Sequence, residues 1–322
     1  MTAPHPRGRA ALALAMTTLS LAVLAACSSA SPTETPTPAP TATATPPPTP
    51  QPTATPSPTP IPLDEELLGR RFTVLVAGED TNLVRRADAS HQPRTDALMV
   101  VSVSADKSQI ALISLPRDTV DVPMADGTIY HRKVNGIADE SGMEVLRGAM
   151  ATLLGVPIDR YIGVDMDDFA WMVDAVGGID VEVQTRISDP NVDLYLEPGP
   201  AHLDGADALS FSRTRADSDY GRAARQQQVV LALVREWLNS GSGTLIGSVR
   251  LLGSLQTDIE LSEVPTLLEI GRRSALAEVS AIVLQPPRFS LFEGFEPNSN
   301  RGWVMIPNVE AMRAYAQSVL SD

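Results

Sequence analysis

The chain has 322 residues, of which 43% are hydrophobic and 20% are charged, values of a globular protein that exclude a wholly disordered or collagen-like chain. Its 25 basic and 39 acidic residues give a net charge of −14, which excludes general nucleic-acid binding because that requires a basic surface. The single cysteine excludes an intrachain disulfide and a cysteine-rich zinc site.

The N-terminus has the pattern of a secretory signal that ends in a cysteine. Arg7 and Arg9 precede an apolar run that closes with Leu24-Ala-Ala-Cys27. This order predicts export, and the run is too short and too rich in alanine for a stable membrane span. Leu-Ala-Ala-Cys resembles a bacterial lipobox. We expect residues 1–27 to be a signal peptide, with Cys27 lipid-anchored at the outer face of the cytoplasmic membrane; a coincidental cysteine is the alternative.

Residues 28–62 are predicted to be a disordered stalk. Between residues 32 and 62, 13 of 31 positions are proline, and nearly all the others are Thr, Ala or Ser. This composition offers no core-forming side chains and favours extended polyproline II backbone. At roughly 3 Å per residue the stretch reaches about 90 Å, which is enough to hold a domain away from a membrane. We expect residues 63–322 to form that domain.

The folded part mixes predicted strands and helices. Buried strands are predicted over 72–78, 96–104 and 109–115, and the short turn between the last two predicts a hairpin. Further along, the pattern predicts helices over 142–154, 168–176, 205–211 and 222–239, and strands over 161–164, 179–183 and 279–284. This succession predicts an α/β (mixed α+β) fold, with a central mixed, largely antiparallel sheet flanked by helices.

Charged residues gather where three of these strands begin or end. Asp80 lies just past the first strand and Asp96 opens the second, so antiparallel pairing puts both carboxylates at one end of the sheet. The hairpin returns the third strand to that end, where Arg117 and Asp118 follow. Oxygen ligands of this kind suit Mg²⁺ or Mn²⁺. The alternative is that polar residues simply cap strand ends that face water.

A second charged cluster surrounds the start of the predicted helix 222–239. Four arginines lie within 13 residues: Arg213, Arg215, Arg222 and Arg225. Asp219 is expected to cap this helix, so that Arg222 and Gln226 lie on one face near its start. Helix N-termini attract anions, so this stretch predicts a phosphate or pyrophosphate site. A solvated basic helix end is the alternative. The apolar residues between 229 and 238 are expected mainly to face the core, and the alternative for some of them is that they line an apolar ligand channel.

Taken in order, these motifs resemble the LytR–CpsA–Psr family over residues 72–239. No single motif is specific for this family, but nine motifs in this order are specific for it. The pieces are Val76-Ala-Gly-Glu-Asp80, Arg94-Thr-Asp96, Ser114-Leu-Pro-Arg117-Asp118, Lys133-Val-Asn135, Tyr161-Ile-Gly-Val164, Val173-Asp-Ala-Val-Gly-Gly178, Leu203-Asp-Gly205, Arg213-Thr-Arg215, and Gly221-Arg222 with Arg225-Gln-Gln.

The resemblance implies an extracytoplasmic, membrane-anchored phosphotransferase. Such an enzyme moves a glycopolymer from a polyprenyl-pyrophosphate carrier to peptidoglycan or another wall acceptor, and holds the polyprenyl chain in an apolar groove. On the matching motifs, Asp80 and Asp96 would bind Mg²⁺, or Mn²⁺, and Asp118 is the candidate general base. The residues implied to contact the pyrophosphate are Arg117, Arg213, Arg215, Arg222, Arg225 and Gln226; the first three would also be catalytic.

Two features depart from the family pattern, and two other functions stay open. The family's usual anchor is a membrane helix rather than a lipobox with a stalk, and Glu79 stands where a small or apolar residue is commoner. A hydrolase that cleaves polyprenyl pyrophosphates with water is one alternative, and a non-catalytic lipoprotein that binds anionic wall polymer is the other. Adjacent carboxylates oppose simple anion binding, and the 4% aromatic content is low for a glycan-binding module.

Overall fold

The computed structural model describes residues 62–240, 245–253 and 255–320. The predicted signal peptide, Cys27 and the stalk lie outside these described residues. Within them, no helix is long and apolar enough to cross a membrane. The described chain opens with the short helix α1 (Glu65–Gly69), which leads into the central sheet.

A six-stranded mixed sheet lies at the centre, with strand order β11-β6-β1-β2-β3-β12. Its members are β1 (Phe72–Glu79), β2 (Thr95–Val103), β3 (Gln109–Ser114), β6 (Arg160–Val164), β11 (Gln256–Thr257) and β12 (Glu278–Val283). β1 pairs antiparallel with β2 and β2 with β3, whereas β6 and β12 run parallel to β1 and β3. The predicted strands, hairpin and largely antiparallel mixed sheet are confirmed.

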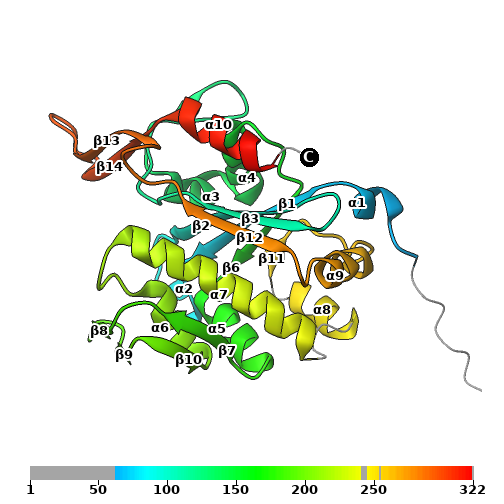
Figure 1. Ribbon diagram of the computed structural model, residues 1–322. Helices are drawn as coiled ribbons and strands as arrows, with labels where there is room; N and C mark the ends of the chain where they lie inside the picture. The colour runs from blue at the N-terminus through cyan, green and yellow to red at the C-terminus, as the bar shows by residue number, and fades with distance from the viewer. Residues whose placement is uncertain (1–61, 241–244, 254, 321–322) are drawn as a thin grey trace, which may run out of the picture. The chain divides into compact units, whose positions relative to one another are not determined.

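One face of the sheet is covered by α4 (Met143–Leu154) and α10 (Val309–Leu320), with η1 (Val134–Gly136) and α3 (Ile137–Ser141) beside them (Figure 1). Leu146, Met150 and Leu153 recur at helical spacing on α4 and are fully buried. They pack with inward-facing strand residues such as Leu75 and Val100 in the largest core cluster. The predicted helix over 142–154 is confirmed, with Gly142 at its N-cap.

The opposite face carries α7 (Asp219–Asn239), which runs across the sheet in Figure 1. A second core cluster lies beyond it. This cluster is built from α5 (Met166–Ala175), α6 (Gly205–Arg213), β7 (Ile179–Val183), β8 (Ile187–Asp189), β9 (Leu194–Leu196), β10 (Gly199–Leu203) and α7. The predicted Asp219 cap is wrong: α7 begins at Asp219, and the Ser218 side chain accepts the cap hydrogen bond from the Gly221 amide. Since Ser218 supplies this oxygen, the Asp219 carboxylate points elsewhere, toward Arg117 and Arg215.

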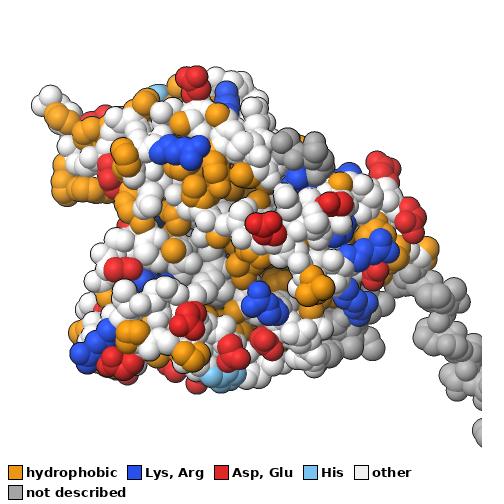
Figure 2. All heavy atoms as spheres, viewed as in Figure 1, with side chains coloured by type: hydrophobic (Ala, Val, Ile, Leu, Met, Phe, Trp, Pro, Cys, Tyr) orange, Lys and Arg blue, Asp and Glu red, His pale blue; other side chains and the backbone are white. Residues whose placement is uncertain are grey.

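Several short elements were given no residue range by the sequence prediction, which expected two or three further helices after residue 239 without placing them. They are α2 (Leu83–Arg86), β4 (Val122–Pro123), β5 (Ile129–Tyr130), α8 (Leu245–Leu252), α9 (Val264–Arg273), and the hairpin of β13 (Ser290–Phe295) and β14 (Trp303–Pro307). The hairpin projects from the body near α10 in Figure 1, and Figure 2 shows hydrophobic side chains gathered on it. Met305 exchanges backbone hydrogen bonds with Asp118 and Val120, both 3.0 Å long. The hairpin is therefore joined directly to the loop that follows Arg117.

Candidate functional site

The end of β1, the start of β2 and the loop after β3 meet at one end of the sheet. Gly78 pairs with Ala97 across β1 and β2, and the Asp80 amide donates a 2.8 Å hydrogen bond to the Arg94 carbonyl. The Arg117 guanidinium reaches back from the third strand to form an ion pair with Asp96. The structure thus brings Asp80, Asp96 and Arg117 together, as the strand pattern predicts.

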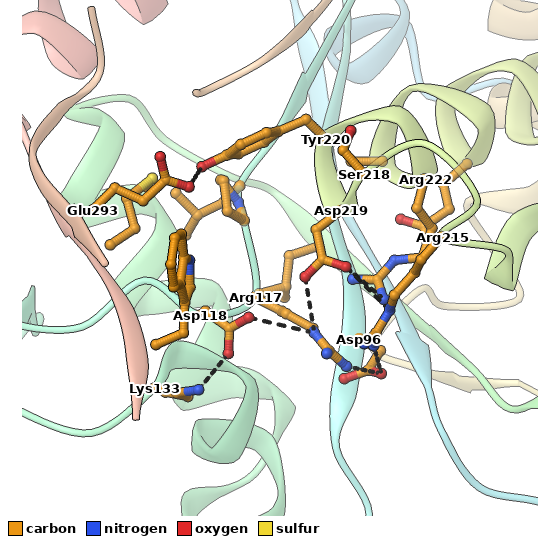
Figure 3. A pocket seen from close by; sticks show the side chains of 17 residues that line it. Asp96, Arg117, Asp118, Lys133, Arg215, Ser218, Asp219, Tyr220, Arg222 and Glu293 are labelled. Atoms are coloured by element: carbon orange, nitrogen blue, oxygen red, sulfur yellow. Dashed lines mark hydrogen bonds and ion pairs between the residues drawn. The ribbon is translucent and has the colours of Figure 1, made fainter. Parts of the chain in front are cut away.

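Guanidinium groups outnumber the two carboxylates at this end. Arg85 forms an ion pair with Asp80 Oδ1, and Arg213 Nη2 lies 3.8 Å from that oxygen. Asp96 is shared between Arg117 and Arg215, and Arg215 Nη2 lies 4.0 Å from Asp96 Oδ2 (Figure 3). Four guanidinium groups therefore surround these two carboxylates, and together they can bind an anion with more than one charge.

Arg222 is the most deeply buried cation of the group. It lies in the first turn of α7, and its side chain is only 6% exposed. Burial, together with the charge of the neighbouring Arg117, lowers the pKa of Arg222 to about 10. Its Nε makes no hydrogen bond within the described residues. A buried guanidinium costs free energy unless its donors are satisfied, so this group is suited to receive a phosphate oxygen.

Gln226 joins this cluster, whereas Arg225 does not. Gln226 lies one turn beyond Arg222, and its amide donates to the Ser212 carbonyl at 3.1 Å. Arg225 instead bonds the Thr214 carbonyl at 2.6 Å and the Asp217 carboxylate at 2.9 Å. The donors of Arg225 are therefore committed to the segment that carries Arg213 and Arg215, and its contact with the pyrophosphate stays a prediction.

A glycine in the same helix turn explains how Asp217 reaches Arg225. A Cβ at Gly221 would lie 2.0 Å from Asp217 Oδ2, so only glycine lets the carboxylate cross this turn. The two oxygens of Asp217 then bind Arg225 in a bidentate ion pair. The Gly221-Arg222 motif thus serves two purposes, one in shaping the loop and one in placing the buried guanidinium.

An apolar cavity of about 740 Å³ opens on one side of the arginine cluster. Its walls come from β1, β2, β6, α5, α7, α8 and α9. Among the lining side chains are Val76, Met99, Ile162, Phe169, Val230, Leu233, Val234, Trp237, Leu238, Leu267 and Leu268. Residues of α7 that were expected mainly to face the core therefore line this cavity. The apolar groove implied beside Arg117, Arg213 and Arg215 is present, since all three line its wall.

A polar cleft of about 510 Å³ adjoins the same cluster (Figure 3). It shares Asp96, Arg117, Arg215, Arg222 and Gln226 with the apolar cavity. Its remaining walls include Asp118, Lys133, Asp219, Tyr220, Glu293 and Trp303. The arginine cluster thus forms the boundary between an apolar and a polar compartment.

Salt bridges and hydrogen bonds fix the charged groups of this cleft. Lys133 Nζ lies 2.6 Å from Asp118 Oδ1, and Arg117 Nε lies 3.7 Å from Asp118 Oδ2. Across the cleft the Tyr220 hydroxyl donates to Glu293 (Figure 3). Sequence reasoning missed Tyr220, Glu293 and Trp303 as site residues. The aromatic residues Phe292, Phe295 and Trp303 in the two runs 290–295 and 303–307 were the available signal for strands there.

The fit of a divalent cation can be tested on the two strand-end carboxylates. No group of three or more His, Cys, Asp or Glu side chains is placed to hold a metal within the described residues. Asp96 Oδ1, however, is buried and has no hydrogen-bond partner there, and Asp80 lines the same cavity. Mg²⁺ commonly takes one or two carboxylates and completes its shell with substrate phosphates and water. Asp80 and Asp96 fit that arrangement, with the substrate supplying the remaining oxygens.

The sequence matches one protein family and two named relatives over much of its length. Residues 54–289 match the LytR_cpsA_psr family. The chain is 31% identical over 196 residues to the polyisoprenyl-teichoic acid–peptidoglycan teichoic acid transferase TagU of Halalkalibacterium halodurans, which covers 59% of this chain and 62% of that protein. It is 29% identical over 194 residues to the polyisoprenyl-teichoic acid–peptidoglycan teichoic acid transferase TagV of Bacillus subtilis, and the match covers 57% of this chain and 50% of that protein. The matches thus span about half to three fifths of these relatives.

Solved structures agree with the sequence comparison. The crystal structure of Bacillus subtilis TagV superposes with a TM-score of 0.62 at 27% identity, covering 78% of this chain and 98% of that one. A structure of TagT with bound octaprenyl pyrophosphate lipid superposes with a TM-score of 0.56 at 21% identity, covering 79% and 92%. This second likeness shows the fold alone.

Proposed function

Because the chain belongs to the LytR_cpsA_psr family, we propose that it is an extracytoplasmic phosphotransferase that moves a glycopolymer from a polyprenyl pyrophosphate to peptidoglycan or another wall acceptor. The observation that carries this proposal is the position of Arg117, Arg215 and Arg222 between an apolar cavity and a polar cleft. Relatives named as teichoic acid transferases support the reaction class, and export, with a lipid anchor on Cys27, would place the enzyme beside both substrates.

The apolar cavity accounts for recognition of the carrier. A polyprenyl tail loses contact with water when it enters a cavity lined by side chains such as Leu233, Trp237 and Leu267, and that transfer is favourable in proportion to the buried area. The volume of about 740 Å³ lies in the range of small-molecule sites. The tail thereby brings the pyrophosphate to the arginines at the mouth of the cavity.

The arginines bind the pyrophosphate through forked, permanently charged donors. Guanidinium groups match phosphate oxygens two at a time, which an ammonium group cannot do. Arg222 contributes a buried donor, and Arg213 and Arg215 are 40% and 48% exposed, so they can adjust to an incoming substrate. These charges stabilise the transition state because negative charge gathers on the phosphoryl oxygens and the leaving group.

The transfer step is a substitution at the sugar-side phosphorus. The acceptor hydroxyl oxygen forms a bond to that phosphorus, the bond from the phosphorus to the bridging oxygen breaks, and polyprenyl monophosphate leaves. The hydroxyl proton passes to the Asp118 carboxylate, which Lys133 holds at 2.6 Å. Lys133 and Arg117 hold the Asp118 carboxylate in position to receive this proton.

We further propose that Asp80 and Asp96 hold Mg²⁺, or Mn²⁺, when substrate is bound. The buried Oδ1 of Asp96 that lacks a hydrogen-bond partner within the described residues supports this assignment. A bound Mg²⁺ would neutralise charge on the pyrophosphate oxygens. The carboxylates also hold Arg85, Arg213, Arg117 and Arg215 in place.

Mass analysis of the products tests the proposed reaction. The full-length chain in detergent is incubated with a polyprenyl-pyrophosphate oligosaccharide, a peptidoglycan oligosaccharide and Mg²⁺. We expect the acceptor to gain the donor oligosaccharide together with one phosphate, and polyprenyl monophosphate to accumulate. Release of oligosaccharide phosphate without any acceptor product identifies a hydrolase instead, and an unchanged donor identifies a non-catalytic binding protein.

The anchor has its own test. Cys27→Ser should abolish incorporation of a labelled fatty acid into the protein in cells, because the thiol is the only lipidation site that the lipobox offers. Equal labelling of the variant and the parent chain would show that Cys27 is not the anchor.

A further inference from the structure

The hairpin β13–β14 forms a wall of the polar cleft, although it lies beyond residue 289, where the family match ends. Backbone and side-chain hydrogen bonds hold the hairpin against the loop that follows Arg117. Met305 pairs with the backbone of Asp118 and Val120. Arg301 in the hairpin loop also bonds Asp121 at 3.0 Å and the His131 carbonyl at 2.8 Å. The side chains that the hairpin presents are therefore fixed relative to Arg117.

Two of these side chains give the cleft the chemistry of a sugar-binding site. Trp303 lines the cleft and is 46% exposed, with its ring held edge-on by Phe295 at 5.6 Å between centroids. Glu293 accepts from Tyr220 through Oε1, so Oε2 can receive another hydroxyl. An indole ring packs against the C–H face of a pyranose, and carboxylates accept hydrogen bonds from its hydroxyls.

The charges of the outer cleft oppose a phosphate there. Asp118, Asp219 and Glu293 all line it, and Lys133 is already paired with Asp118. Burial and the bond to Glu293 raise the pKa of Tyr220, so its hydroxyl stays protonated and remains a donor to Glu293. A neutral, hydroxyl-rich group fits this surface better than an anion or a lipid does.

The direction of the transfer step identifies which sugar occupies the cleft. In phosphoryl transfer the attacking and leaving oxygens lie roughly in line through phosphorus. The leaving oxygen belongs to polyprenyl phosphate, whose tail occupies the apolar cavity. The attacking hydroxyl therefore approaches from the side of the arginine cluster that faces away from the tail. The polar cleft offers walls there that the apolar cavity does not share, formed by Asp118, Glu293 and Trp303.

On the premise of the proposed function, we propose that the polar cleft is the acceptor subsite. A sugar of the wall glycan stacks on Trp303, hydrogen-bonds Glu293 and presents its hydroxyl to Asp118 and the sugar-side phosphorus. The donor's own first sugar is the competing occupant. The hairpin thus sets acceptor specificity, while the rest of the site serves the carrier.

Kinetics with the full-length chain in detergent separate these two occupants. Trp303→Ala should raise the KM for a peptidoglycan oligosaccharide roughly tenfold, with the donor KM unchanged. Trp171→Ala is the matched control, because Trp171 is 44% exposed and lines neither cavity. Glu293→Gln should also raise the acceptor KM, whereas Glu278→Gln on β12 should not. An unchanged acceptor KM, or a raised donor KM in its place, would overturn the proposal.

A binding measurement without turnover tests the acceptor subsite independently of the proposed reaction. Calorimetric titration of the peptidoglycan oligosaccharide into the chain, with no donor present, should show roughly tenfold weaker binding for Trp303→Ala than for Trp171→Ala. If the parent chain binds the glycan in this way but never cleaves a polyprenyl pyrophosphate, the proposed function fails and the subsite stands. If the two variants bind the glycan equally, the subsite is wrong whatever the enzyme catalyses.

Discussion

The apolar cavity and the polar cleft meet at the same arginines but are built differently. The cavity is walled by regular elements of the central domain, among them β6, α7 and α9, and most of its lining is apolar. The cleft is walled by a loop, by the first turn of α7 and by the hairpin β13–β14, and its lining is mostly charged or aromatic. Helix α7 contributes to both, its first turn to the cleft and its later turns to the cavity.

This difference shows how one site handles a substrate with two unlike ends. A lipid tail needs water excluded over a large surface, which packed helices provide. A sugar needs hydrogen-bonding groups at fixed positions, which a braced hairpin provides. The pyrophosphate joins the two ends, so its ligands must lie where the compartments meet, as Arg117, Arg215 and Arg222 do.

Removing a carboxylate at the boundary should have the largest effect. Asp96→Ala should lower kcat by on the order of 10³, because it removes a proposed Mg²⁺ ligand and the group that orients Arg117. Added Mg²⁺ should restore at most part of the activity. Assays across Mg²⁺ concentrations measure this, and Asp180→Ala, an exposed aspartate on β7, is the control. Near-normal turnover, or a loss explained wholly by a melted fold, would remove Asp96 from the site.

Replacing a boundary arginine by lysine should have the next largest effect. Arg215→Lys keeps the charge but loses the forked donors, and should cost about 2–4 kcal/mol in kcat/KM if the contact tightens in the transition state. Arg225→Lys is the informative comparison, since Arg225 binds Asp217 and the Thr214 carbonyl instead of facing either cavity. It should lower the melting temperature more than Arg215→Lys does. If Arg225→Lys lowers kcat/KM as much as Arg215→Lys does and leaves the melting temperature unchanged, Arg225 contacts the pyrophosphate.

A charge placed in the apolar cavity should affect only donors with long tails. Val234 lines the cavity yet is 52% exposed, so Val234→Asp should leave the fold intact. The KM for a long-chain polyprenyl donor should rise roughly tenfold, because the carboxylate disfavours burial of the tail. The KM for a short-chain analogue should barely change. Val145→Asp on α4, outside both cavities, controls for added surface charge, and an equal rise for both donors would mean that the tail binds elsewhere.

Replacing Glu79 should have the smallest effect, and that effect should be on thermal stability. Burial raises the pKa of Glu79, and nearby Arg86 opposes the shift. A carboxyl whose folded-state pKa is raised stabilises the fold most below its unfolded pKa and loses that contribution as pH rises through the folded value. Glu79→Gln should therefore melt slightly higher than the parent at pH 7, and the difference should vanish toward pH 4. A variant that melts lower at pH 7 and requires more Mg²⁺ would make Glu79 a metal ligand.

The apolar pattern predicts the sheet end of the site well. Strand periodicity and one short turn were enough to bring Asp80, Asp96 and Arg117 together, because antiparallel neighbours return the chain to the same end. The prediction needed only local pairing of consecutive strands, which the structure confirms. The Arg213–Gln226 stretch was also placed correctly at a helix start, although Ser218 rather than Asp219 caps it.

The cleft could not be predicted in the same way because its contacts join distant parts of the chain. Glu293 meets Tyr220 73 residues away, and Met305 pairs with Asp118 and Val120 across an even longer separation. No periodicity encodes such pairings. The partner of Arg225 could not be predicted for a related reason, since helical spacing gives the face on which Arg225 lies but not the Asp217 carboxylate that binds its donors. The apolar residues of α7 were ambiguous because periodicity does not distinguish a core from a cavity wall.

A crystal structure of the chain with a non-cleavable methylene-bridged polyprenyl pyrophosphate tests most directly that the arginine cluster separates a lipid compartment from a sugar compartment. We predict density for the tail in the apolar cavity between α7 and α9, with both phosphorus atoms within contact distance of Arg117, Arg215 and Arg222. Density for the tail in the polar cleft beside Glu293, or phosphates bound away from these arginines, would contradict it.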